Sequence, residues 1–343
     1  MALAVVTSDR FADHITPPGH PERVERAEAM QVVASRWQDG GGVILAPRAA
    51  ADEDLVRVHD PAYVQSLVET RGRASMLDPD TFTSPESEEV GRLAAGAVLT
   101  GIDYVMDDET GRRAFVMVRP PGHHAEAGRA MGFCLYNSIA VGAAYARSRG
   151  LSRVAVIDYD VHHGNGTQWM FYDNPSVLVV SSHQFPFYPG TGAATDTGRG
   201  EGVGTTVNLP LEAGAGDADY DLVYREVCGL IEEHRPQLVL VSAGFDAHER
   251  DPLAGMRMTT EGFARVTARL LLTADAVCDG RAVFVTEGGY DTHALAECCQ
   301  RVIDMASMDL VTSPMPPTGD TKRGAAALKA AREAQAGRWN SLK

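Results

Sequence analysis

The densest group of potentially catalytic residues lies in the segment Asp158–Thr167, which holds two aspartates and two histidines. This segment directly follows Val154–Ile157, a β-branched apolar run typical of a buried strand. Several charged side chains close to a buried strand need a nearby opposite charge to be stable, and a bound metal ion usually supplies it. Asp160 and His162 are two residues apart, so an extended backbone directs both side chains to one side. The segment therefore predicts a metal site at the end of a strand.

Three more apolar runs are each followed by residues suited to catalysis. The runs are Ala114–Val118, Leu238–Val241 and Ala282–Val285, and the residues after them are His123 with His124, Asp246, and Tyr290, respectively. In open α/β sheets, ligands bind beyond the carboxyl ends of the strands. We therefore expect these residues to share one site with the segment Asp158–Thr167.

Three of these side chains form a suitable set of metal ligands, namely Asp160, His162 and Asp246. Three protein ligands leave a tetrahedral ion with one position for water, as in catalytic zinc sites. Zinc lowers the pKa of such a water to about 7 and polarises a carbonyl group. We predict one Zn²⁺ per chain, although Fe²⁺, Co²⁺ or Mn²⁺ also suits these ligands.

The adjacent His123 and His124 supply imidazoles for general acid–base catalysis near neutral pH. Each ring needs an orienting partner, and Asp158 and Asn165 are the candidates. Tyr290, which follows two glycines, can donate its hydroxyl hydrogen to a developing oxyanion. These parts together predict metal-assisted hydrolysis of a carbonyl compound, with an amide favoured.

Short apolar runs alternate with longer helix-like segments along most of the chain. The expected strands are Leu3–Val6, Val43–Ala46, Ala114–Val118, Val154–Ile157, Val177–Val180, Thr206–Leu209, Leu238–Val241 and Ala282–Val285. The longer helix-like segments span residues 87–106, 137–149, 220–234 and 260–277. Continuous apolar strands between helices are typical of a parallel sheet covered on both faces. We predict an α/β fold with a mostly parallel eight-stranded sheet.

The sequence shows no internal repeat or linker that would divide it before residue 312. A turn-rich stretch at residues 312–319 precedes an Ala-rich, basic segment that ends at residue 343. We predict a single catalytic domain at residues 1–311 and an extension at residues 312–343. A docked helix is favoured over a flexible tail because Leu328, Trp339 and Leu342 need cover.

Composition narrows the possible partners and the compartment. A net charge of −15 argues against nucleic-acid binding but is compatible with a cationic substrate. The five cysteines show no CxxC spacing, which indicates a reduced, cytoplasmic protein. No apolar run approaches the ~18 residues of a membrane span, and the first residues lack the pattern of a signal peptide.

Four motifs in their order along the chain resemble those of the histone deacetylase superfamily. They are Arg119–His124, Asp158–Gly166, Ala243–Asp246 and Glu287–Tyr290, and the similarity extends back to about His14. The superfamily includes bacterial histone-deacetylase-like amidohydrolases and acetylpolyamine amidohydrolases. The resemblance implies an arginase-like α/β fold, and Asn165 is typical of the class II and bacterial branch.

The resemblance also implies individual roles for the catalytic residues. Asp160, His162 and Asp246 would be the zinc ligands. His124, paired with Asn165, would be the general base and acid, while His123, paired with Asp158, would give electrostatic support. Tyr290 would polarise the amide carbonyl.

Further ligands and substrate contacts follow from the same resemblance. A structural K⁺ would be held by Asp158, the backbones of Asp160 and His162, and Ser181 with Ser182. A weaker ion site would fall around Phe171, Asn174 and Val177. The substrate tunnel would be lined by Asp80, Gly132, Phe133, Tyr188 and Leu253.

The substrate is less defined than the reaction. We expect an N-acyl amide, such as acetyl-lysine or a small acylated amine, with an acetylpolyamine as the alternative. Polyamine-selective members of the superfamily carry a glutamate where this chain has Leu253. The dimeric acetylpolyamine amidohydrolases carry an insertion before the histidine pair, and the short interval between His14 and His123 leaves little room for it here. The sequence is compatible with an oligomer.

Two other classes of function would need residues or losses that this sequence does not show. An arginase-like ureohydrolase needs a further carboxylate two residues after the ligand histidine, where this chain has Gly164. A non-catalytic binder of acylated metabolites typically lacks the tyrosine or a histidine, whereas Tyr290, His123 and His124 are all present. Both alternatives are therefore less favoured than a deacylase.

Overall fold

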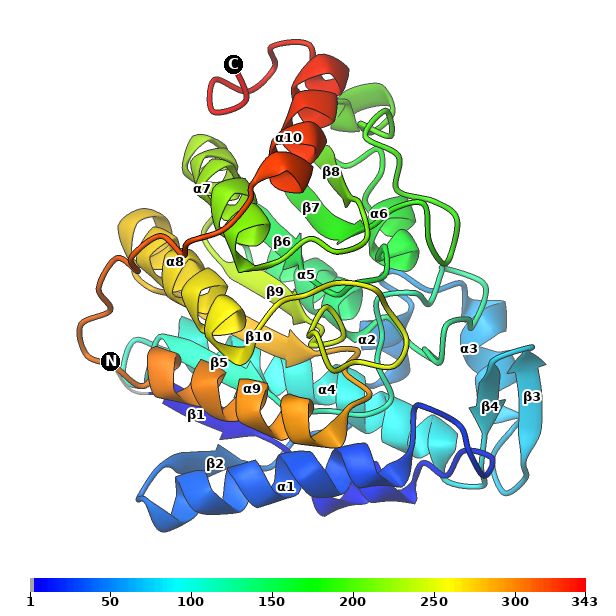
Figure 1. The fold of residues 1–343 in the computed structure, drawn as a ribbon. Helices are drawn as coiled ribbons and strands as arrows, with labels where there is room; N and C mark the ends of the chain where they lie inside the picture. Colours follow the sequence, from blue (N-terminus) through cyan, green and yellow to red (C-terminus); the bar gives the residue numbers. More distant parts are fainter. Residues whose placement is uncertain (1–2) are drawn as a thin grey trace.

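One eight-stranded sheet forms the centre of the molecule (Figure 1). The structure is a computed structural model, and it describes residues 3–343. The strand order is β2-β1-β5-β10-β9-β6-β7-β8, and every pairing between these strands is parallel. The strands are β1 (Leu3–Val6), β2 (Val43–Leu45), β5 (Arg113–Val116), β6 (Val154–Asp158), β7 (Val177–Gln184), β8 (Thr206–Leu211), β9 (Val239–Ala243) and β10 (Ala282–Thr286). The predicted parallel eight-stranded sheet is confirmed.

Helices cover both faces of this sheet (Figure 1). The α-helices are α1 (Val24–Asp39), α2 (Asp52–Leu55), α3 (Pro61–Val68), α4 (Ser87–Met106), α5 (Ser138–Ser148), α6 (Asn165–Met170), α7 (Asp217–His234), α8 (Thr260–Cys278), α9 (Thr292–Ala306) and α10 (Lys322–Gln335), and the short 3-10 helices are η1 (Asp9–Asp13) and η2 (Gly200–Gly202). Neighbouring strand residues belong to opposite layers: Phe284 belongs to the core cluster that includes residues of α1 and α7–α10, whereas Val285 belongs to the cluster that includes residues of α3–α5. This alternation explains why the strands are continuously apolar.

The starts of α5, α8 and α9 follow from local capping chemistry. The side chain of Asn137 accepts a hydrogen bond from the Ala140 N–H at 3.0 Å before α5. Thr259 and Asp291 accept the corresponding bonds before α8 and α9, respectively. Short polar side chains at these positions satisfy backbone N–H groups that have no partner inside the helix. A small antiparallel hairpin, β3 (Ser75–Asp78) with β4 (Thr81–Thr83), was not anticipated from the sequence.

The C-terminal segment contacts the rest of the molecule through α10. Leu328 and Leu342 are buried, and the Gln335 amide donates to the Thr206 carbonyl at 2.7 Å. Trp339 Nε1 donates to the carbonyl of Gly204 at 2.8 Å. These contacts hold α10 against α7 and β8. The division into a domain at 1–311 and an extension at 312–343 stays a prediction, and its first two residues lie outside the described range.

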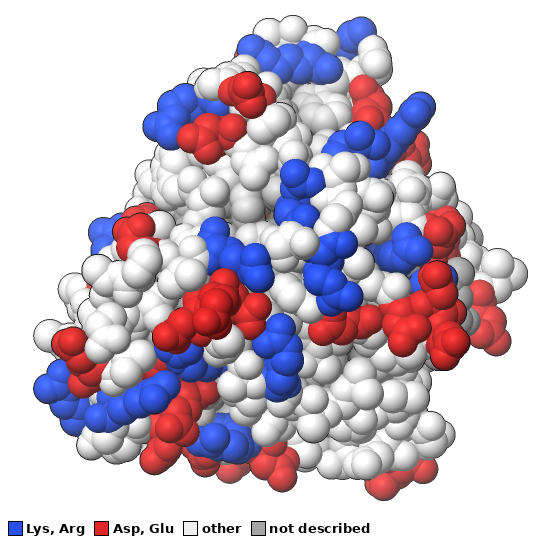
Figure 2. Space-filling model, turned by 180° about the vertical axis from the view of Figure 1, so that it is seen from behind, with Lys and Arg blue, Asp and Glu red and all other residues white. Residues whose placement is uncertain are grey.

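Lys and Arg side chains are interspersed with Asp and Glu over the face shown in Figure 2, and the described residues form no continuous basic surface there. Within residues 3–343, no helix is both long and apolar enough to cross a membrane. All five cysteines, Cys134, Cys228, Cys278, Cys298 and Cys299, are free thiols.

Candidate active site

The candidate site lies at the carboxyl ends of the four central strands. β5, β10, β9 and β6 are neighbours in the sheet, so the loops that follow them meet at one edge. These four loops carry the predicted catalytic and metal-binding residues. The structure thus brings together side chains that are far apart in the sequence, such as His124 and Tyr290, which line one cavity.

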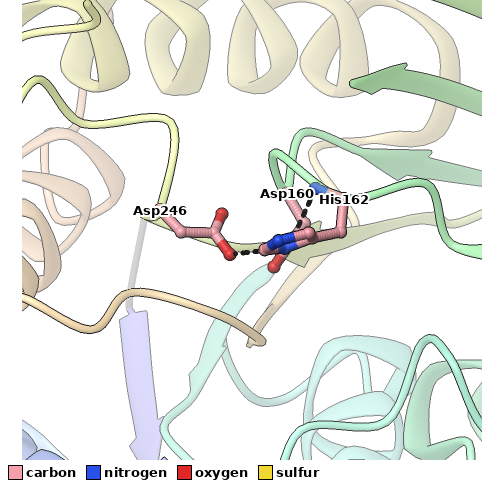
Figure 3. A group of neighbouring side chains, drawn as sticks. All are labelled: Asp160, His162 and Asp246. Atoms are coloured by element: carbon pink, nitrogen blue, oxygen red, sulfur yellow. Dashed lines mark hydrogen bonds and ion pairs between the residues drawn. The ribbon is translucent and has the colours of Figure 1, made fainter. Parts of the chain in front are cut away.

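Asp160, His162 and Asp246 form a compact, buried group (Figure 3). Their potential ligand atoms all lie within 4.8 Å of one another. The Nδ1 atom of His162 is 3.2 Å from Asp160 Oδ1 and 3.1 Å from Asp246 Oδ2. Among the described residues, this is the one group of three or more such side chains that could hold a metal ion.

This donor set fits a small divalent cation. Ligand atoms about 2.0 Å from a tetrahedral ion are about 3.3 Å apart, close to the separations around His162 Nδ1. That nitrogen can carry one proton at most, yet two carboxylates face it. Burial disfavours a charged ring, but Asp160 and Asp246 outweigh it and raise the pKa of His162 to about 10. The two carboxylates thus create a strong local preference for positive charge.

Backbone N–H groups orient both carboxylates of the group. The Gly288 N–H donates to Asp160 Oδ2 at 2.8 Å, and the Val161 N–H donates to Asp246 Oδ1 at 2.8 Å. Each carboxylate therefore keeps an oxygen directed toward His162. Gly288 is required here because an added Cβ would lie 2.0 Å from Asp246 Oδ2.

His123 and His124 stand beside this group, with ring centroids 4.0 Å apart. The Nδ1 atom of His123 lies 2.9 Å from Asp158 Oδ2. The Nδ1 atom of His124 lies 2.8 Å from Asn165 Oδ1. Both rings are buried, and each has the orienting partner that the sequence suggested.

The two rings differ in their electrostatic surroundings. Burial disfavours the charged form of His123, but the Asp160 and Asp158 carboxylates outweigh it and raise the pKa of His123 well above its usual value. For His124, burial is the largest influence, and together with the nearby His123 and His162 it lowers the pKa well below the usual value. The surroundings therefore favour the charged form of His123 and the neutral form of His124.

Tyr290 lines the same cavity as His124 and His162. Its backbone N–H donates to Asp251 Oδ2 at 2.7 Å, and its ring contacts Phe133 with centroids 5.7 Å apart. Burial raises the pKa of the Tyr290 hydroxyl well above 10, so this group stays protonated. The buried Arg26 guanidinium lies 5.0 Å from the ring centroid and packs over the ring. A neutral hydroxyl in this position can donate to an oxyanion.

A cavity of about 230 Å³ opens onto these groups. It is lined by Asp80, His124, Gly132, Phe133, His162, Phe187, Tyr188, Leu253 and Tyr290. All five residues expected along a substrate tunnel are in this lining. Phe187, which stacks on the His162 ring with centroids 5.4 Å apart, was not anticipated.

The cavity wall at Gly132 and Phe133 has an unusual backbone. Both residues adopt positive φ angles, 56° and 68°. A Cβ at Gly132 would lie 2.4 Å from His124 Cδ2, so glycine is required for this close approach. The Asp80 carboxylate accepts a hydrogen bond from the Gly132 N–H at 3.2 Å and holds the turn against the hairpin loop.

The residues expected at the potassium site also lie together. Asp158 is paired with Ser181 across β6 and β7. The Ser182 hydroxyl lies 3.5 Å from the Asp158 carbonyl oxygen and 2.9 Å from the Tyr224 hydroxyl. Among the residues expected at a weaker ion site, the Asn174 N–H donates to the Phe171 carbonyl at 3.0 Å.

Two further residues support the site and were not predicted. Glu287 accepts hydrogen bonds from the Gly122 N–H at 2.6 Å and the His123 N–H at 3.1 Å. Its position directly after β10 is a signal that could have identified it. Glu126 contacts the Asn165 amide at 2.8 Å, and no sequence pattern indicates this contact.

A parallel α/β sheet with a buried Asp–His–Asp group, a histidine pair and a tyrosine around one cavity has the arrangement of a metal-assisted hydrolase. Residues 18–306 match the histone deacetylase domain family. The chain is therefore an enzyme of the deacetylase class and belongs to the histone deacetylase family.

Comparisons with individual proteins agree with this assignment. A histone deacetylase-like amidohydrolase of Pseudomonas aeruginosa is 42% identical over 265 residues, 75% of this chain and 69% of that protein. The human polyamine deacetylase HDAC10 is 37% identical over 93% of this chain and 50% of its own length. The crystal structure of the HDA15 HD domain superposes with a TM-score of 0.91 at 33% identity, covering 99% of this chain and 96% of that one.

Proposed function

We propose that the protein is a zinc-dependent deacylase that hydrolyses a linear N-acyl amide. One observation carries this proposal: His124, Tyr290 and His162 line one cavity, and His162 belongs to the buried Asp160–His162–Asp246 group. Zn²⁺ would be held by the two carboxylates and by Nδ1 of His162. When bound, zinc supplies a water of lowered pKa and polarises the carbonyl group.

His124 acts as the proton carrier in this reaction. Its Nδ1 faces Asn165, which leaves Nε2 as the nitrogen available at the cavity. A neutral ring accepts a proton from the attacking water as the new C–O bond forms. The same ring then gives that proton to the leaving nitrogen as the C–N bond breaks, which releases the carboxylate and the amine.

His123 and Tyr290 stabilise the charge that develops during the reaction. The charged His123 ring, paired with Asp158, places positive charge next to the reacting centre. The Tyr290 hydroxyl donates to the carbonyl oxygen as it becomes negative. Both groups are fixed in advance by packing and hydrogen bonds, so little reorganisation is needed at the moment of reaction.

The cavity suits an acyl group on an extended amine chain. Its walls include Phe133, Phe187 and Tyr188, and Asp80 stands at the wall as an acceptor. An acetyl-lysine side chain or a small acylated amine fits these surroundings. An acetylpolyamine is the second candidate because of the similarity to the human polyamine deacetylase. Leu253 favours the first candidate, since it offers no charge to a distal ammonium group.

A ureohydrolase or a pure binder has less support. A second metal ion needs further ligands, and residues 3–343 contain one suitable group. A side chain at Gly164 would also need space that is occupied, because a Cβ there would lie 2.2 Å from Asp158 Oδ2. A protein that only binds acylated metabolites does not need a histidine oriented for proton transfer, whereas His124 is oriented in this way by Asn165.

Further proposals follow from the same family membership. K⁺ would be bound by Asp158, the backbones of Asp160 and His162, Ser181 and Ser182, where it would stabilise the loop that carries the zinc ligands. Phe171, Asn174 and Val177 would hold a weaker ion. We also propose that residues 1–311 form the catalytic unit and that the enzyme works in the cytoplasm.

The test is turnover by zinc-loaded protein on an acetyl-lysine peptide and on N-acetylputrescine and N8-acetylspermidine, with kcat/KM for each. We expect the peptide to be preferred. The variant Leu253→Glu should shift the ratio toward the polyamines, because it adds a carboxylate at the cavity lip. Absence of turnover on every acyl amide would refute the proposed function.

A further inference from the structure

The amide of Asn165 links the ring of His124 to the carboxylate of Glu126. On one side, Asn165 Oδ1 lies 2.8 Å from Nδ1 of His124. On the other side, Asn165 Nδ2 donates to Glu126 Oε1 at 2.8 Å. The same Nδ2 also approaches the His124 carbonyl at 3.3 Å and Met131 Sδ at 3.4 Å. Each of these three neighbours of the nitrogen is a hydrogen-bond acceptor.

The Glu126 carboxylate fixes which way the Asn165 amide points. An ionised carboxylate only accepts hydrogen bonds, so the amide NH₂ group must face it. The amide oxygen must then face Nδ1 of His124, and that nitrogen must carry the ring proton. Nε2 of His124 is left with a lone pair, as a general base requires. With the amide reversed, two oxygens would meet at the Glu126 side and the ring would be held in the other tautomer.

We propose that Glu126 is a positioning residue that sets the tautomer of His124 through Asn165. This inference rests on the proposed function, in which His124 is the general base. Of the three acceptors around Asn165 Nδ2, Glu126 makes the shortest contact and is the charged one. A charge-assisted hydrogen bond is roughly twice as strong as a neutral one, so Glu126 dominates the choice.

The backbone of Glu126 is held in place by contacts on both sides. Its N–H donates to the Arg129 carbonyl at 2.9 Å, which closes a tight turn. Its own carbonyl lies 3.1 Å from Nδ1 of the buried His59. The Glu126 side chain is 27% exposed and also contacts the Arg129 guanidinium at 3.1 Å. A partly exposed ion pair such as Glu126–Arg129 contributes little to the free energy of unfolding. We therefore expect variants of Glu126 to fold.

The test exchanges the polarity of the Glu126–Asn165 hydrogen bond. In Glu126→Gln, the side chain can donate or accept, so the amide loses the charged acceptor that dominates its direction and keeps only the longer contacts to the His124 carbonyl and Met131 Sδ. In Asn165→Asp, two carboxylates face each other at the Glu126 contact. In the double variant, the carboxylate introduced at position 165 accepts from His124 Nδ1 on one side and from the new glutamine amide on the other.

We expect each single variant to lower kcat about 10- to 100-fold, in the range for residues that orient a ligand or base. The double variant should return to within about 3-fold of the wild-type kcat, with KM similar throughout. Glu109→Gln, which makes the same charge change before β5 at the opposite edge of the sheet, is the matched control and should leave kcat unchanged. A Glu126→Gln kcat within about 2-fold of wild type, or losses that add in the double variant, would overturn the proposal.

A measurement without turnover separates this inference from the proposed function. Nitrogen NMR of ¹⁵N-histidine-labelled protein, with His124 assigned by its replacement with Gln, reports the tautomer directly. We expect Nδ1 of His124 to be protonated in wild type and in the double variant, and mixed tautomers in Glu126→Gln. The same tautomer in all of them refutes the role of Glu126 even if the enzyme is active. Wild-type protein that shows the expected tautomers but hydrolyses no acyl amide would instead refute the proposed function.

Discussion

The adjacent rings of His123 and His124 contact partners of different charge, although their centroids are only 4.0 Å apart. His123 faces the Asp158 carboxylate, and His124 faces the neutral Asn165 amide. A carboxylate favours the charged form of an imidazole, whereas an amide oxygen adjacent to a cationic ring does little to offset burial. The proposed reaction therefore assigns electrostatic support to His123 and proton transfer to His124, two roles that a single histidine could not fill at one time.

Tyr290→Phe should remove catalysis while preserving binding. The hydroxyl is positioned to donate to an oxyanion that exists only during the reaction, so its loss should lower kcat about 100- to 1000-fold. KM and the affinity for an uncleaved substrate analogue should change little. Steady-state kinetics and calorimetry of the same preparation provide the two measurements.

Tyr104→Phe is the matched control for this substitution. Tyr104 lies on α4, outside the cavity lining, and its replacement should leave kcat unchanged. If Tyr290→Phe kept most of the wild-type kcat, the oxyanion role would be wrong. If its affinity for the analogue also vanished, Tyr290 would be a substrate-binding residue.

Chelation should inactivate the enzyme reversibly. Removal of the metal leaves the buried Asp160 and Asp246 carboxylates without the positive charge that balances them, and added Zn²⁺ should restore activity at one ion per chain.

Asp246→Asn should lower the metal content strongly, because it removes a charged ligand at the same side-chain volume. Elemental analysis beside activity checks both statements. Full activity in metal-free protein, or two ions per chain, would contradict the single-metal site.

The apolar runs predicted the sheet because its strands, apart from the edge strand β2, are buried along almost their whole length. Val154–Asp158 is apolar at four successive positions. A strand with one face in solvent would instead alternate apolar and polar residues, so this run predicts a strand buried on both faces. The β3–β4 hairpin has no such signal, since Ser75–Asp78 and Thr81–Thr83 are short and mixed in character. Its structure depends on tertiary contacts such as that between the Asp80 carboxylate and the Gly132 N–H.

The candidate site was predictable where its residues follow a strand directly. Asp246 and Tyr290 are of this kind, and their strands are neighbours in the sheet. Phe187 and Glu126 lie in irregular loops, where the chain path decides which residue reaches the site. Sequence spacing carries no information on that path, so these two contacts emerged only from the structure.

Acid should destabilise the fold through buried neutral histidines. His59 accepts a hydrogen bond at Nε2 from the Asn137 N–H at 2.9 Å, and its Nδ1 faces the Glu126 carbonyl at 3.1 Å. Burial lowers the pKa of His59 from 6.5 to about 4. As the pH falls, the unfolded chain therefore takes up a proton on His59 at a higher pH than the folded chain does. This contribution to the free energy of unfolding is fully present above pH 6.5 and declines toward pH 4, by about 3 kcal/mol for one such site.

Urea denaturation at a series of pH values measures this decline. His59→Gln should be less stable than wild type at about pH 7 but lose less of its stability between pH 6.5 and pH 4. His293→Gln removes an exposed histidine and is the matched control. An unchanged pH dependence in His59→Gln would show that other groups govern acid sensitivity.

Glu22→Gln should cost more stability than any surface charge change. Both Glu22 carboxylate oxygens accept from Arg119, at 2.6 and 2.7 Å, and Arg26 donates to one of them at 2.9 Å. All three side chains are fully buried. Burial works against the charge of Glu22, but Arg119 and His14 outweigh it and hold the pKa of Glu22 well below 4.5. A neutral glutamine would leave two buried guanidinium groups without a counter-charge.

Breaking such a buried pair from one side typically costs about 3–5 kcal/mol of unfolding free energy. Urea denaturation near neutral pH measures this loss directly. The exposed pair between Asp173 and Arg199, with N and O 2.9 Å apart, provides the control, and Asp173→Asn should cost less than about 1 kcal/mol. Arg26 also donates to the carbonyls of Glu287 and Gly289, so the loop that carries Tyr290 loses support in Glu22→Gln. Equal losses in the two variants would mean that the buried charges are compensated by the backbone carbonyls rather than by Glu22.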